Sequence, residues 1–341
     1  MTIIGGDINF DVNVIHGYRR FCNKVYQATK YVLGKIPKDF KPLPSITKSG
    51  KESLAELWIL HKLNVASIDI NKALEAREFS EATQIAYQYC YNHLCDVYIE
   101  NSKSIILDGS PEESESAQQT LYTALEGGLT MLHPFMPFLT EELWQRLPRR
   151  PNDTCPSIVK AAYPQYVKDF ENAAAEEVYE LVLALSKAIR SLAAQYDIKE
   201  SAEIHIKPQS KELETTCKDQ LPSIKTLGGK PTYGDSAVVT VLSPQDADPS
   251  GCIPQAVGTS AAVFLVVKDR VDIDKEIEKA KQRRDKANEL VKKQQSLITG
   301  EGWGKMKEDA QKTEKRRLED AESEVALLES SVEQFERLKL E

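Results

Sequence analysis

The sequence predicts a mainly α-helical protein with three parts: an antiparallel helical bundle, a small α/β domain and a C-terminal antiparallel coiled-coil hairpin. Apolar residues recur at three- and four-residue steps through the first 150 positions, short β-branched runs follow after position 200, and heptad-like spacing occupies the last 70 positions. The composition agrees, because 41% apolar and 28% charged residues suit exposed helices better than one large core.

The bundle is expected over residues 1–150. Five amphipathic segments are bounded by helix start and stop signals, and they cover residues 14–33, 52–76, 80–101, 114–133 and 140–147. The second segment carries one apolar stripe that includes Leu54, Leu57 and Leu60. Loops are expected at the proline-bearing stretch 35–51 and at GSPEESES, residues 109–116. Short connections between amphipathic helices predict an antiparallel bundle.

A linker and an α/β domain are expected next. Four prolines between positions 148 and 164 mark residues 151–171 as the linker. The domain that follows, residues 172–270, mixes helical periodicity with alternating and continuous apolar runs. Its expected helices and strands cover, in chain order, residues 173–196, 203–207, 211–225, 237–242 and 261–268.

The last part, residues 271–341, is expected to be an arm of two helices. Apolar and small residues from Ile273 onward alternate in steps of four and three, the stretch ITGEGWGK breaks the pattern with glycines, and a second run follows from Leu318. At 1.5 Å per residue the first arm helix is expected to be roughly 40 Å long. Arg284 and Gln294 fall on its seam and should weaken it.

Several classes of chemistry find no support in the sequence. It has no GxxxxGK[ST] phosphate-binding loop, no GxSxG elbow and no pair of histidines at zinc-ligand spacing. The six cysteines follow no metal-binding pattern and are expected to be free thiols in a reducing compartment. No run approaches the roughly 20 apolar residues of a membrane span, and the N-terminus does not resemble a signal peptide. We therefore assign no catalytic residue, metal ligand or cofactor to this chain.

Charge is unevenly distributed along the arm, although the whole chain has a formal net charge of −8. Residues 281–317 hold twelve Lys or Arg against six Asp or Glu, whereas residues 318–341 hold eight acids against two bases. Clustered exposed cations attract phosphates, and an exposed tryptophan can stack on a base. The candidate nucleic-acid contacts are Arg283, Lys286, Lys292, Lys293, Trp303, Lys305, Arg316 and Arg317. A solvated coiled-coil surface with interhelical ion pairs explains the same charges equally well.

The first helix offers a second polar face. Hydrogen-bonding side chains recur on it at helical spacing, namely Arg19, Arg20, Asn23, Lys24, Gln27 and Lys30. With Tyr26 and Tyr31 among them, this face is suited to hold single-stranded bases. A solvated helix face without a ligand is the alternative interpretation.

Several strings resemble a known family. HPFMPFLTEELWQRLP, residues 133–148, resembles the signature of the helical anticodon-binding domain in the valine, isoleucine, leucine and methionine group of class I aminoacyl-tRNA synthetases. GGDINFDV, GYRRFCNKVYQATKYVL, SLAELWILHKL and the tail from VDIDKEIEK are similar to the valine enzyme, most of all to its eukaryotic cytosolic, fungal type. The isoleucine enzyme often ends in a zinc-binding cysteine cluster, which this sequence lacks. The resemblance extends over essentially all 341 residues.

The resemblance implies tRNA binding without catalysis. The family's HIGH-like and KMSKS-like ATP-binding signatures and its editing domain are missing from the sequence, so ATP and magnesium belong to the parent enzyme and this chain should be inactive alone. The bundle would hold the anticodon region of a valine tRNA, and the arm would bind phosphates of the tRNA body. The matched segments supply as candidate base readers Arg19, Asn23, Lys24, Lys30 and Trp58.

The same resemblance sets expectations about the surroundings of the protein. We expect a cytoplasmic monomer that binds tRNA, with other translation factors as further partners and no membrane. The sequence leaves open whether the chain is one end of a longer ligase or a stand-alone regulatory RNA-binding paralogue. A different class of function is a protein-interaction module, because coiled-coil arms also tether partner proteins or dimerise.

Overall fold

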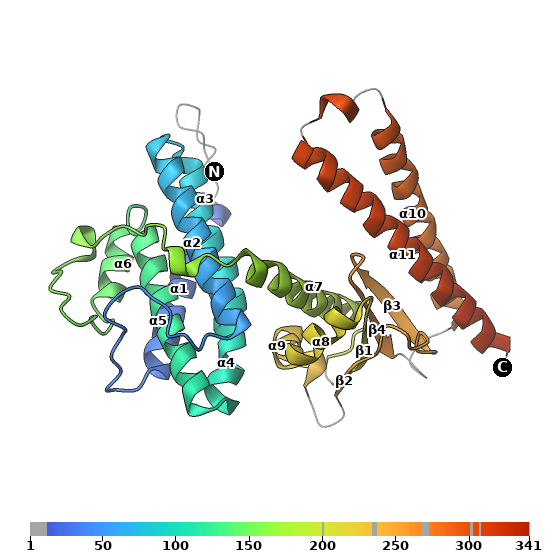
Figure 1. Cartoon of the computed structure of the whole chain (residues 1–341), viewed down its shortest axis with the longest axis horizontal. Coiled ribbons are helices and arrows are strands. Elements are labelled where there is room, and N and C mark those ends of the chain that lie inside the picture. Colours follow the sequence, from blue (N-terminus) through green and yellow to red (C-terminus); the bar gives the residue numbers. More distant parts are fainter. Residues whose placement is uncertain are drawn as a thin grey trace. The chain divides into compact units, whose positions relative to one another are not determined.

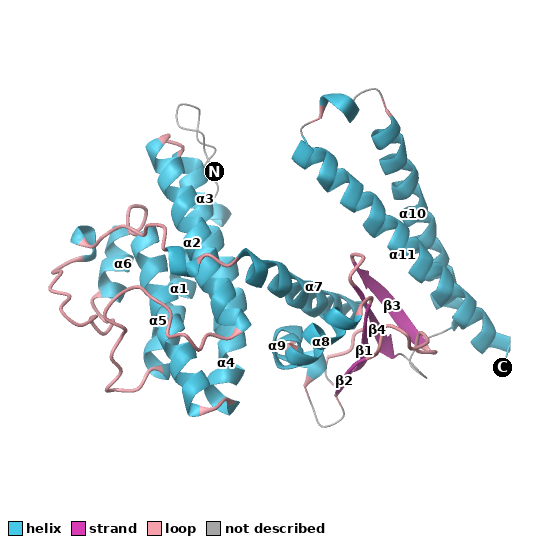
Figure 2. Cartoon of the chain, viewed as in Figure 1, coloured by secondary structure: helices cyan, strands magenta, loops and turns pink. Residues whose placement is uncertain are grey.

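The computed structural model describes residues 12–199, 201–233, 237–266, 273–300, 303–306 and 308–340. It divides into two compact units, Met1–Tyr179 and Glu180–Glu341, and each unit is treated by itself below. Helices dominate the described part and only one small sheet is found there, so the mainly α-helical prediction is confirmed (Figure 2). The predicted domain boundaries at residues 150, 171 and 270 remain predictions.

The first unit is a helical bundle (Figure 1). Its elements are α1 (Val12–Lys35), α2 (Leu54–Glu75), α3 (Phe79–Tyr87), the π-helix η1 (Gln88–Tyr98), α4 (Ile99–Asp108), α5 (Pro111–Leu132), α6 (Pro137–Trp144) and two single 3₁₀ turns, η2 (Ile158–Lys160) and η3 (Lys168–Phe170). Each expected bundle helix is present. The predicted boundaries of the third, fourth and fifth helices were wrong by several residues.

Helix α2 lies at the centre of the bundle rather than on its surface. It contacts α3, α5 and the π-helical segment η1, and residues on most of its circumference are buried. The predicted single stripe was therefore wrong, because Trp58, His61 and Ser67 are as inaccessible as the leucines. A helix that is buried over most of its circumference offers little outer surface to a nucleic acid.

The predicted third helix is longer than expected and changes character in the middle. Residues 79–108 form one continuous helix whose central segment, η1, has π-helical hydrogen bonding. π-Helical turns are rare and occur frequently at functional sites. Tyr87 at the end of α3 and Tyr91 in η1 both contact Phe21 of α1.

The loop predicted over residues 109–116 is mostly helix. Ser110 is the N-cap of α5, its hydroxyl accepts a hydrogen bond from the Glu113 amide at 3.3 Å, and the Glu113 carboxylate accepts one from the Ser110 amide at 2.8 Å. Pro111 occupies the first helical turn, where it needs no amide donor. The polar composition that indicated a loop is a capping box instead.

Helix α7 (Ala173–Gln195) begins against α2 within the first unit. The His61 ring accepts a hydrogen bond from the Asn172 amide at Nδ1, 3.0 Å away, and its Nε2 lies 2.9 Å from Glu176. Lys62 pairs with the other oxygen of Glu176 at 2.5 Å. The Tyr179 ring packs on Trp58 with the ring centroids 4.9 Å apart. His61 is therefore a structural residue, as expected for an isolated histidine.

The second unit contains a four-stranded sheet in the order β2-β1-β4-β3. The strands are β1 (Glu203–Pro208), β2 (Val238–Val241), β3 (Cys252–Val257) and β4 (Ala261–Val266); β1 and β2 are parallel, and the other neighbours are antiparallel. The crossover between β1 and β2 carries α8 (Lys211–Asp219), α9 (Leu221–Gly228) and a 3₁₀ turn, η4 (Lys230–Thr232). Strand β3 was missed, because Pro254 and Gln255 interrupt its apolar pattern.

The arm consists of α10 (Ile273–Thr299), a 3₁₀ turn, η5 (Trp303–Lys305), and α11 (Glu308–Leu340), and its two helices pack along each other (Figure 1). The seam buries Ile277, Ala280, Ala287, Gln294, Ala321, Leu328 and Val332. The base of the arm packs on β3, where Leu327 covers a cluster of Cys252, Ala262 and Phe264. The arm and the sheet therefore share one core.

Candidate nucleic-acid interface

Helix α1 has one buried and one exposed face, as its periodicity predicted. Its buried face holds Phe21, Val25, Ala28, Thr29 and Val32. On the opposite face Tyr18 and Tyr26 are about half exposed, at 51% and 46%. The polar side chains expected there, Arg19, Arg20, Asn23, Gln27 and Lys30, are all exposed. The structure thus presents hydrogen-bond donors and flat rings on one accessible helix face.

An aromatic stack adjoins this face. The ring of Phe21 lies 4.9 Å from that of Tyr87, and Tyr87 stacks on Tyr91 with centroids 5.1 Å apart and planes 11° from parallel. Tyr87 is 38% exposed, so the stack reaches the surface. Sequence reasoning missed Tyr87 and Tyr91. Their spacing of four residues places them on one helix face, which was the available signal.

Lys24 connects α1 to this stack. Its ammonium group lies 3.9 Å from the centre of the Tyr91 ring and forms an ion pair with Asp96 of η1. Partial burial lowers the pKa of Lys24, but the hydrogen bond and the negative charge of Asp96 outweigh it, and the pKa lies above its ordinary value. Lys24 is therefore a fixed positive charge beside the stack, with its strongest contact already made within the protein.

Trp58 does not belong to the interface. Its side chain is fully buried at 0% exposure, between Tyr179 and His93, whose ring centroids lie 4.9 and 5.6 Å from its own. A ring enclosed on all sides cannot stack on a base. The expectation that Trp58 reads a base was wrong, because α2 is central and its tryptophan fills the core of the bundle.

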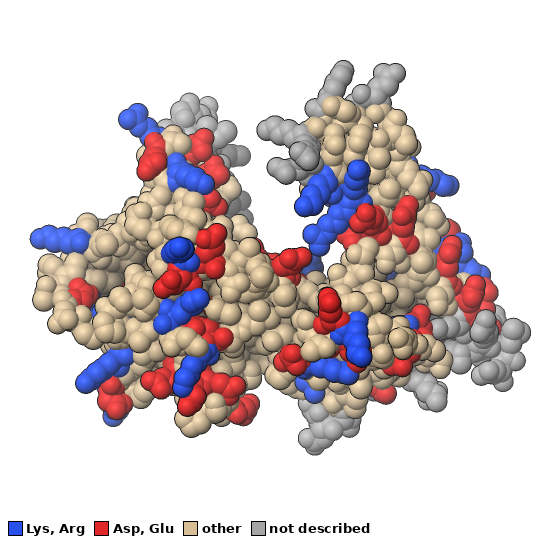
Figure 3. Space-filling model, in the orientation of Figure 1, with Lys and Arg blue, Asp and Glu red and all other residues tan. Residues whose placement is uncertain are grey.

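The arm presents its cations on the outside, as its charge pattern predicted. Lys286, Lys292, Lys293, Arg316 and Arg317 are exposed. Figure 3 shows Lys and Arg side chains gathered over the first half of α11, followed by Asp and Glu further along the helix. A positive surface that ends in an acidic one favours phosphate at one end of the arm only.

Some arm cations already have partners within the protein. Arg317 pairs with Glu314 at 2.5 Å, and Arg283 donates to the side chain of Gln195 on α7. Lys281 pairs across the seam with Glu336 at 2.6 Å. An interhelical ion pair, as the solvated coiled-coil interpretation expects, therefore exists beside exposed cations, and phosphate binding by those cations stays a prediction.

The turn of the arm contains the other two expected contacts. Trp303 is half-buried, and its carbonyl accepts a hydrogen bond from the Gln311 side chain at 2.8 Å. Lys305 ends the 3₁₀ turn, and its side chain lies outside the described residues. The Trp303 side chain is thus only partly accessible at the turn.

Within the described ranges no group of three or more His, Cys, Asp or Glu side chains is arranged to hold a metal ion. All six cysteines are free thiols, and burial raises the pKa of Cys217 to about 11 and of Cys95 and Cys252 to about 12. Thiols with such pKa values are poor nucleophiles. No helix in the part of the chain that the structure describes has the length and hydropathy needed to cross a membrane.

Comparison with known proteins identifies the bundle. A family model described as the anticodon-binding domain of tRNA ligase matches residues 56–208. Residues 56–208 are therefore similar to a tRNA-ligase anticodon-binding domain. The matched range begins in α2 and ends in β1, so this domain includes the core of the bundle and continues beyond it.

Relatives of the whole chain are valine–tRNA ligases. The mitochondrial valine–tRNA ligase of Saccharomyces cerevisiae is 40% identical over 99% of this chain and 30% of its own length. The valine–tRNA ligase of Schizosaccharomyces pombe is 46% identical over 61% of this chain and 21% of its own length, and that of Homo sapiens is 33% identical over 98% and 26%. The chain therefore spans less than a third of the length of these relatives. The resemblance to valine enzymes is confirmed at the level of the anticodon-binding domain.

Proposed function

We propose that this chain is the tRNA-binding portion of a valine–tRNA ligase. The observation that carries the proposal is the similarity to valine–tRNA ligases over 99% of the chain, together with an anticodon-binding domain at its centre. The bundle and the arm both offer accessible cations, which RNA binding requires. The selectivity for valine tRNA rests on the names of the relatives.

In this proposal the α1 face binds the anticodon loop. Unpaired bases in a loop are splayed out and can stack on aromatic rings. Tyr87 and Tyr91 offer such rings, and Arg19, Asn23 and Lys30 offer donors for base edges on the accessible side of α1. Lys24 acts mainly through its contact with Tyr91, because Asp96 already holds its charge.

The arm binds the sugar–phosphate backbone of the tRNA body. Lys286, Lys292, Lys293 and Arg316 are long, exposed and positively charged, and such side chains add affinity without reading sequence. Trp303 at the turn contributes a partly accessible side chain. The arm is thus a clamp, and selectivity belongs to the bundle.

In this proposal, catalysis is performed by a part of the ligase outside this chain. These two relatives are about three times as long as this chain, and ATP, magnesium and valine are assigned to the segment that they possess in addition. We place the protein in the cytoplasm as a monomer, of the fungal type. The mitochondrial name of one relative makes cell fractionation with an antibody to this chain the relevant test.

Filter binding of the full chain to valine tRNA and to a non-cognate tRNA, across a salt series, tests the proposal. We expect salt-sensitive binding to both, with the valine tRNA bound more tightly. Absence of salt-sensitive binding near micromolar concentrations would rule out the tRNA-binding function. Equal affinity for the two tRNAs would remove the valine assignment and leave general RNA binding.

A second candidate function is a protein-interaction module. Leu290 and Leu297 lie seven residues apart on α10, and each is 42% exposed, so the arm has an apolar stripe outside its own seam. Repeated leucines at heptad spacing pair with another helix. Light scattering with and without tRNA separates the two functions, because a stable dimer that ignores tRNA favours the interaction module.

A further inference from the structure

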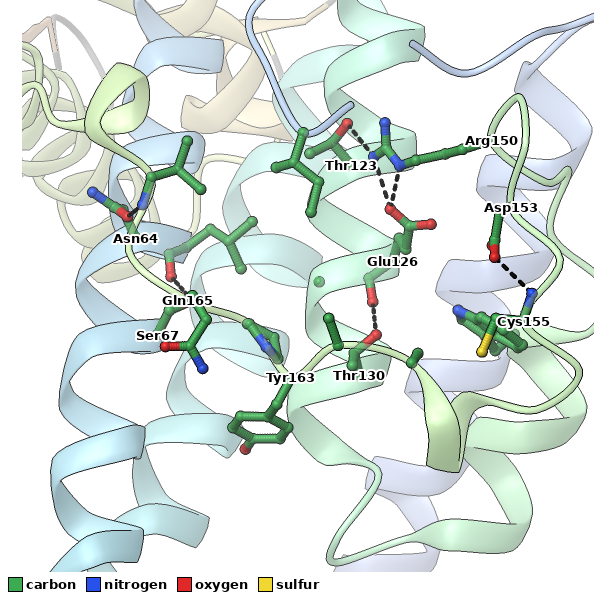
Figure 4. A pocket seen from close by; sticks show the side chains of 18 of the residues that line it. Asn64, Ser67, Thr123, Glu126, Thr130, Arg150, Asp153, Cys155, Tyr163 and Gln165 are labelled. Atoms are coloured by element: carbon green, nitrogen blue, oxygen red, sulfur yellow. Dashed lines mark hydrogen bonds and ion pairs between the residues drawn. The ribbon is translucent and has the colours of Figure 1, made fainter. Parts of the chain in front are cut away.

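The bundle contains a pocket that the RNA-binding surfaces do not use. It lies between α2, α5 and the segment 160–167, and its volume is about 390 Å³ (Figure 4). Pockets of roughly 300–1,000 Å³ are the usual size for small ligands. A cavity of about 150 Å³ already accommodates benzene, so this one has room for a fused ring system.

The segment 160–167 forms a fixed wall of the pocket. The Asn64 side chain accepts a hydrogen bond from the Val167 amide at 2.7 Å, and Asn71 donates to the Pro164 carbonyl at 2.8 Å. Between them, the Tyr163 hydroxyl donates to the Met131 carbonyl of α5 at 3.0 Å. Because the wall is tied to both α2 and α5, the pocket is formed before any ligand enters.

The buried charged groups of the pocket lining, Arg150 and Glu126, already have partners within the protein, whereas Lys160 lines the pocket from an exposed position. Arg150 donates to Glu126 from Nε at 2.8 Å, to Thr123 at 3.2 Å, and to the carbonyls of Leu43 and Ser45 at 2.8 and 3.1 Å. The second Glu126 oxygen accepts from the Tyr122 hydroxyl at 2.9 Å. A charged ligand placed beside Arg150 and Glu126 would be desolvated without a partner, so this buried part of the pocket favours a neutral ligand.

Two hydroxyl groups in the pocket can accept hydrogen bonds from a ligand. Ser67 donates to the Leu63 carbonyl at 2.7 Å, and Thr130 donates to the Glu126 carbonyl at 2.8 Å. Their protons are therefore used, and their oxygen lone pairs can accept a hydrogen bond from a ligand. Figure 4 shows Ser67 on α2 and Thr130 on α5, on opposite sides of the pocket.

The remaining lining is mainly apolar. Leu63, Trp144 and Phe170 line the pocket with buried side chains, and Ala161 and Pro164 line it from the segment 160–167. The Trp144 ring is held in place by Arg149, whose guanidinium carbon lies 3.5 Å from the ring centre. Rigid aromatic and aliphatic walls select flat ligands.

We propose that this pocket binds a neutral, planar molecule of one or two fused rings that carries an N–H donor. The rings lie against Trp144 and Phe170, and the N–H group donates to Ser67 or Thr130. This binding is independent of the α1 face and of the arm. The proposal does not depend on the tRNA-binding function.

The test is ¹⁹F NMR titration of the full chain with 5-fluoroindole. We expect a dissociation constant of about 1 mM or tighter, in keeping with the affinity per atom of small fragments. The N-methyl derivative, which cannot donate, should bind roughly five- to tenfold more weakly. The anionic 5-fluoroindole-3-acetate should bind at least about tenfold more weakly. No binding of 5-fluoroindole, or equal binding of all three, overturns the proposal.

Variants locate the binding. Ala161→Phe fills the pocket and should abolish binding, whereas Ala174→Phe, at an exposed position of α7, should leave it unchanged. Binding that survives Ala161→Phe in a folded protein overturns the assignment to this pocket. If circular dichroism shows that Ala161→Phe does not fold, the double variant Ser67→Ala/Thr130→Val replaces it. That variant should bind 5-fluoroindole and its N-methyl derivative equally, and a preserved preference overturns the proposal.

Discussion

The ammonium group of Lys24 lies 3.9 Å from the centre of the Tyr91 ring, although the two residues are 67 positions apart in the sequence. The contact joins α1 to the π-helical segment η1, and Asp96 of the same segment completes it with an ion pair. A cation fixed over one ring face polarises that ring and holds its plane. Tyr87 stacks on Tyr91, so the same contact orients the exposed end of the stack.

Removal of the stack should weaken RNA binding. Tyr87→Ala and Tyr91→Ala should each reduce the affinity for an isolated valine anticodon stem-loop by about 1–3 kcal/mol, because each removes a ring on which a base can stack. Tyr166→Ala is the control, because this tyrosine is at least as exposed, at 48% against 38% for Tyr87, but lies in the segment 160–167. Fluorescence anisotropy with a labelled stem-loop measures the change. Equal affinities for all three variants would mean that the stack does not bind RNA.

Charge reversal on the arm should weaken the binding of all tRNAs to a similar extent. Changing Lys292, Lys293, Arg316 and Arg317 to Glu removes up to four phosphate contacts, and each contact accounts for about 0.7–0.9 in the slope of log affinity against log salt. We therefore expect a shallower salt slope for cognate and non-cognate tRNA in filter binding. Reversal of four exposed lysines of the α/β part provides the charge-matched control, at Lys187, Lys211, Lys218 and Lys230. A loss of affinity for the cognate tRNA alone would contradict sequence-independent binding and would mean that the arm recognises the tRNA sequence.

Trp58 should behave as a core residue. Trp58→Ala leaves a cavity in the centre of the bundle and should lower the free energy of unfolding by about 3–5 kcal/mol. Trp58→Phe retains most of the packing and should cost less. Urea unfolding followed by circular dichroism measures both, and Trp303→Ala at the arm turn is the tryptophan control. Normal stability of Trp58→Ala together with weakened tRNA binding would restore Trp58 to the interface.

Glu56 should make the bundle less stable as pH rises. Its side chain is 1% exposed, and burial raises its pKa from 4.5 to about 7, against hydrogen bonds from the Ser53 amide and the Ser116 hydroxyl. A pKa raised by folding means that the protonated form is favoured in the native state, so stability is full below pH 4.5 and is lost through pH 7. The free energy of unfolding should fall by up to about 3 kcal/mol over this range.

The substitution Glu56→Gln isolates this effect. A neutral amide cannot ionise, so the variant should be more stable than the wild type at pH 8 and nearly equal to it at pH 4.5. Glu177→Gln, at an exposed position of α7, should follow the wild type at both values. Urea titrations at the two pH values measure the difference. A wild type and a Glu56→Gln variant with parallel pH profiles would show that Glu56 does not titrate in this range.

The sequence by itself determined the elements whose signals are local. The periodicity of α1, α7 and α10 placed each of them within about two residues at either end, because an amphipathic helix repeats its pattern along its own length. The seam of the arm, the family signature around Trp144 and the clustering of arm cations were equally readable. The start of α5 is also encoded locally, because Ser110 and Glu113 form a capping box. The polar composition of this stretch led to the wrong prediction of a loop.

Only the tertiary structure decided which side chains are accessible and which of them meet. Trp58 and the exposed Tyr26 are alike in sequence as aromatic residues on helices, but α2 is surrounded by its neighbours and α1 is not. The Lys24–Tyr91 contact and the pocket wall at Val167 join residues that are 67 and 103 positions apart in the sequence. Such contacts depend on how separate helices pack, and packing follows from the combined shape and burial of all of them rather than from any one pattern.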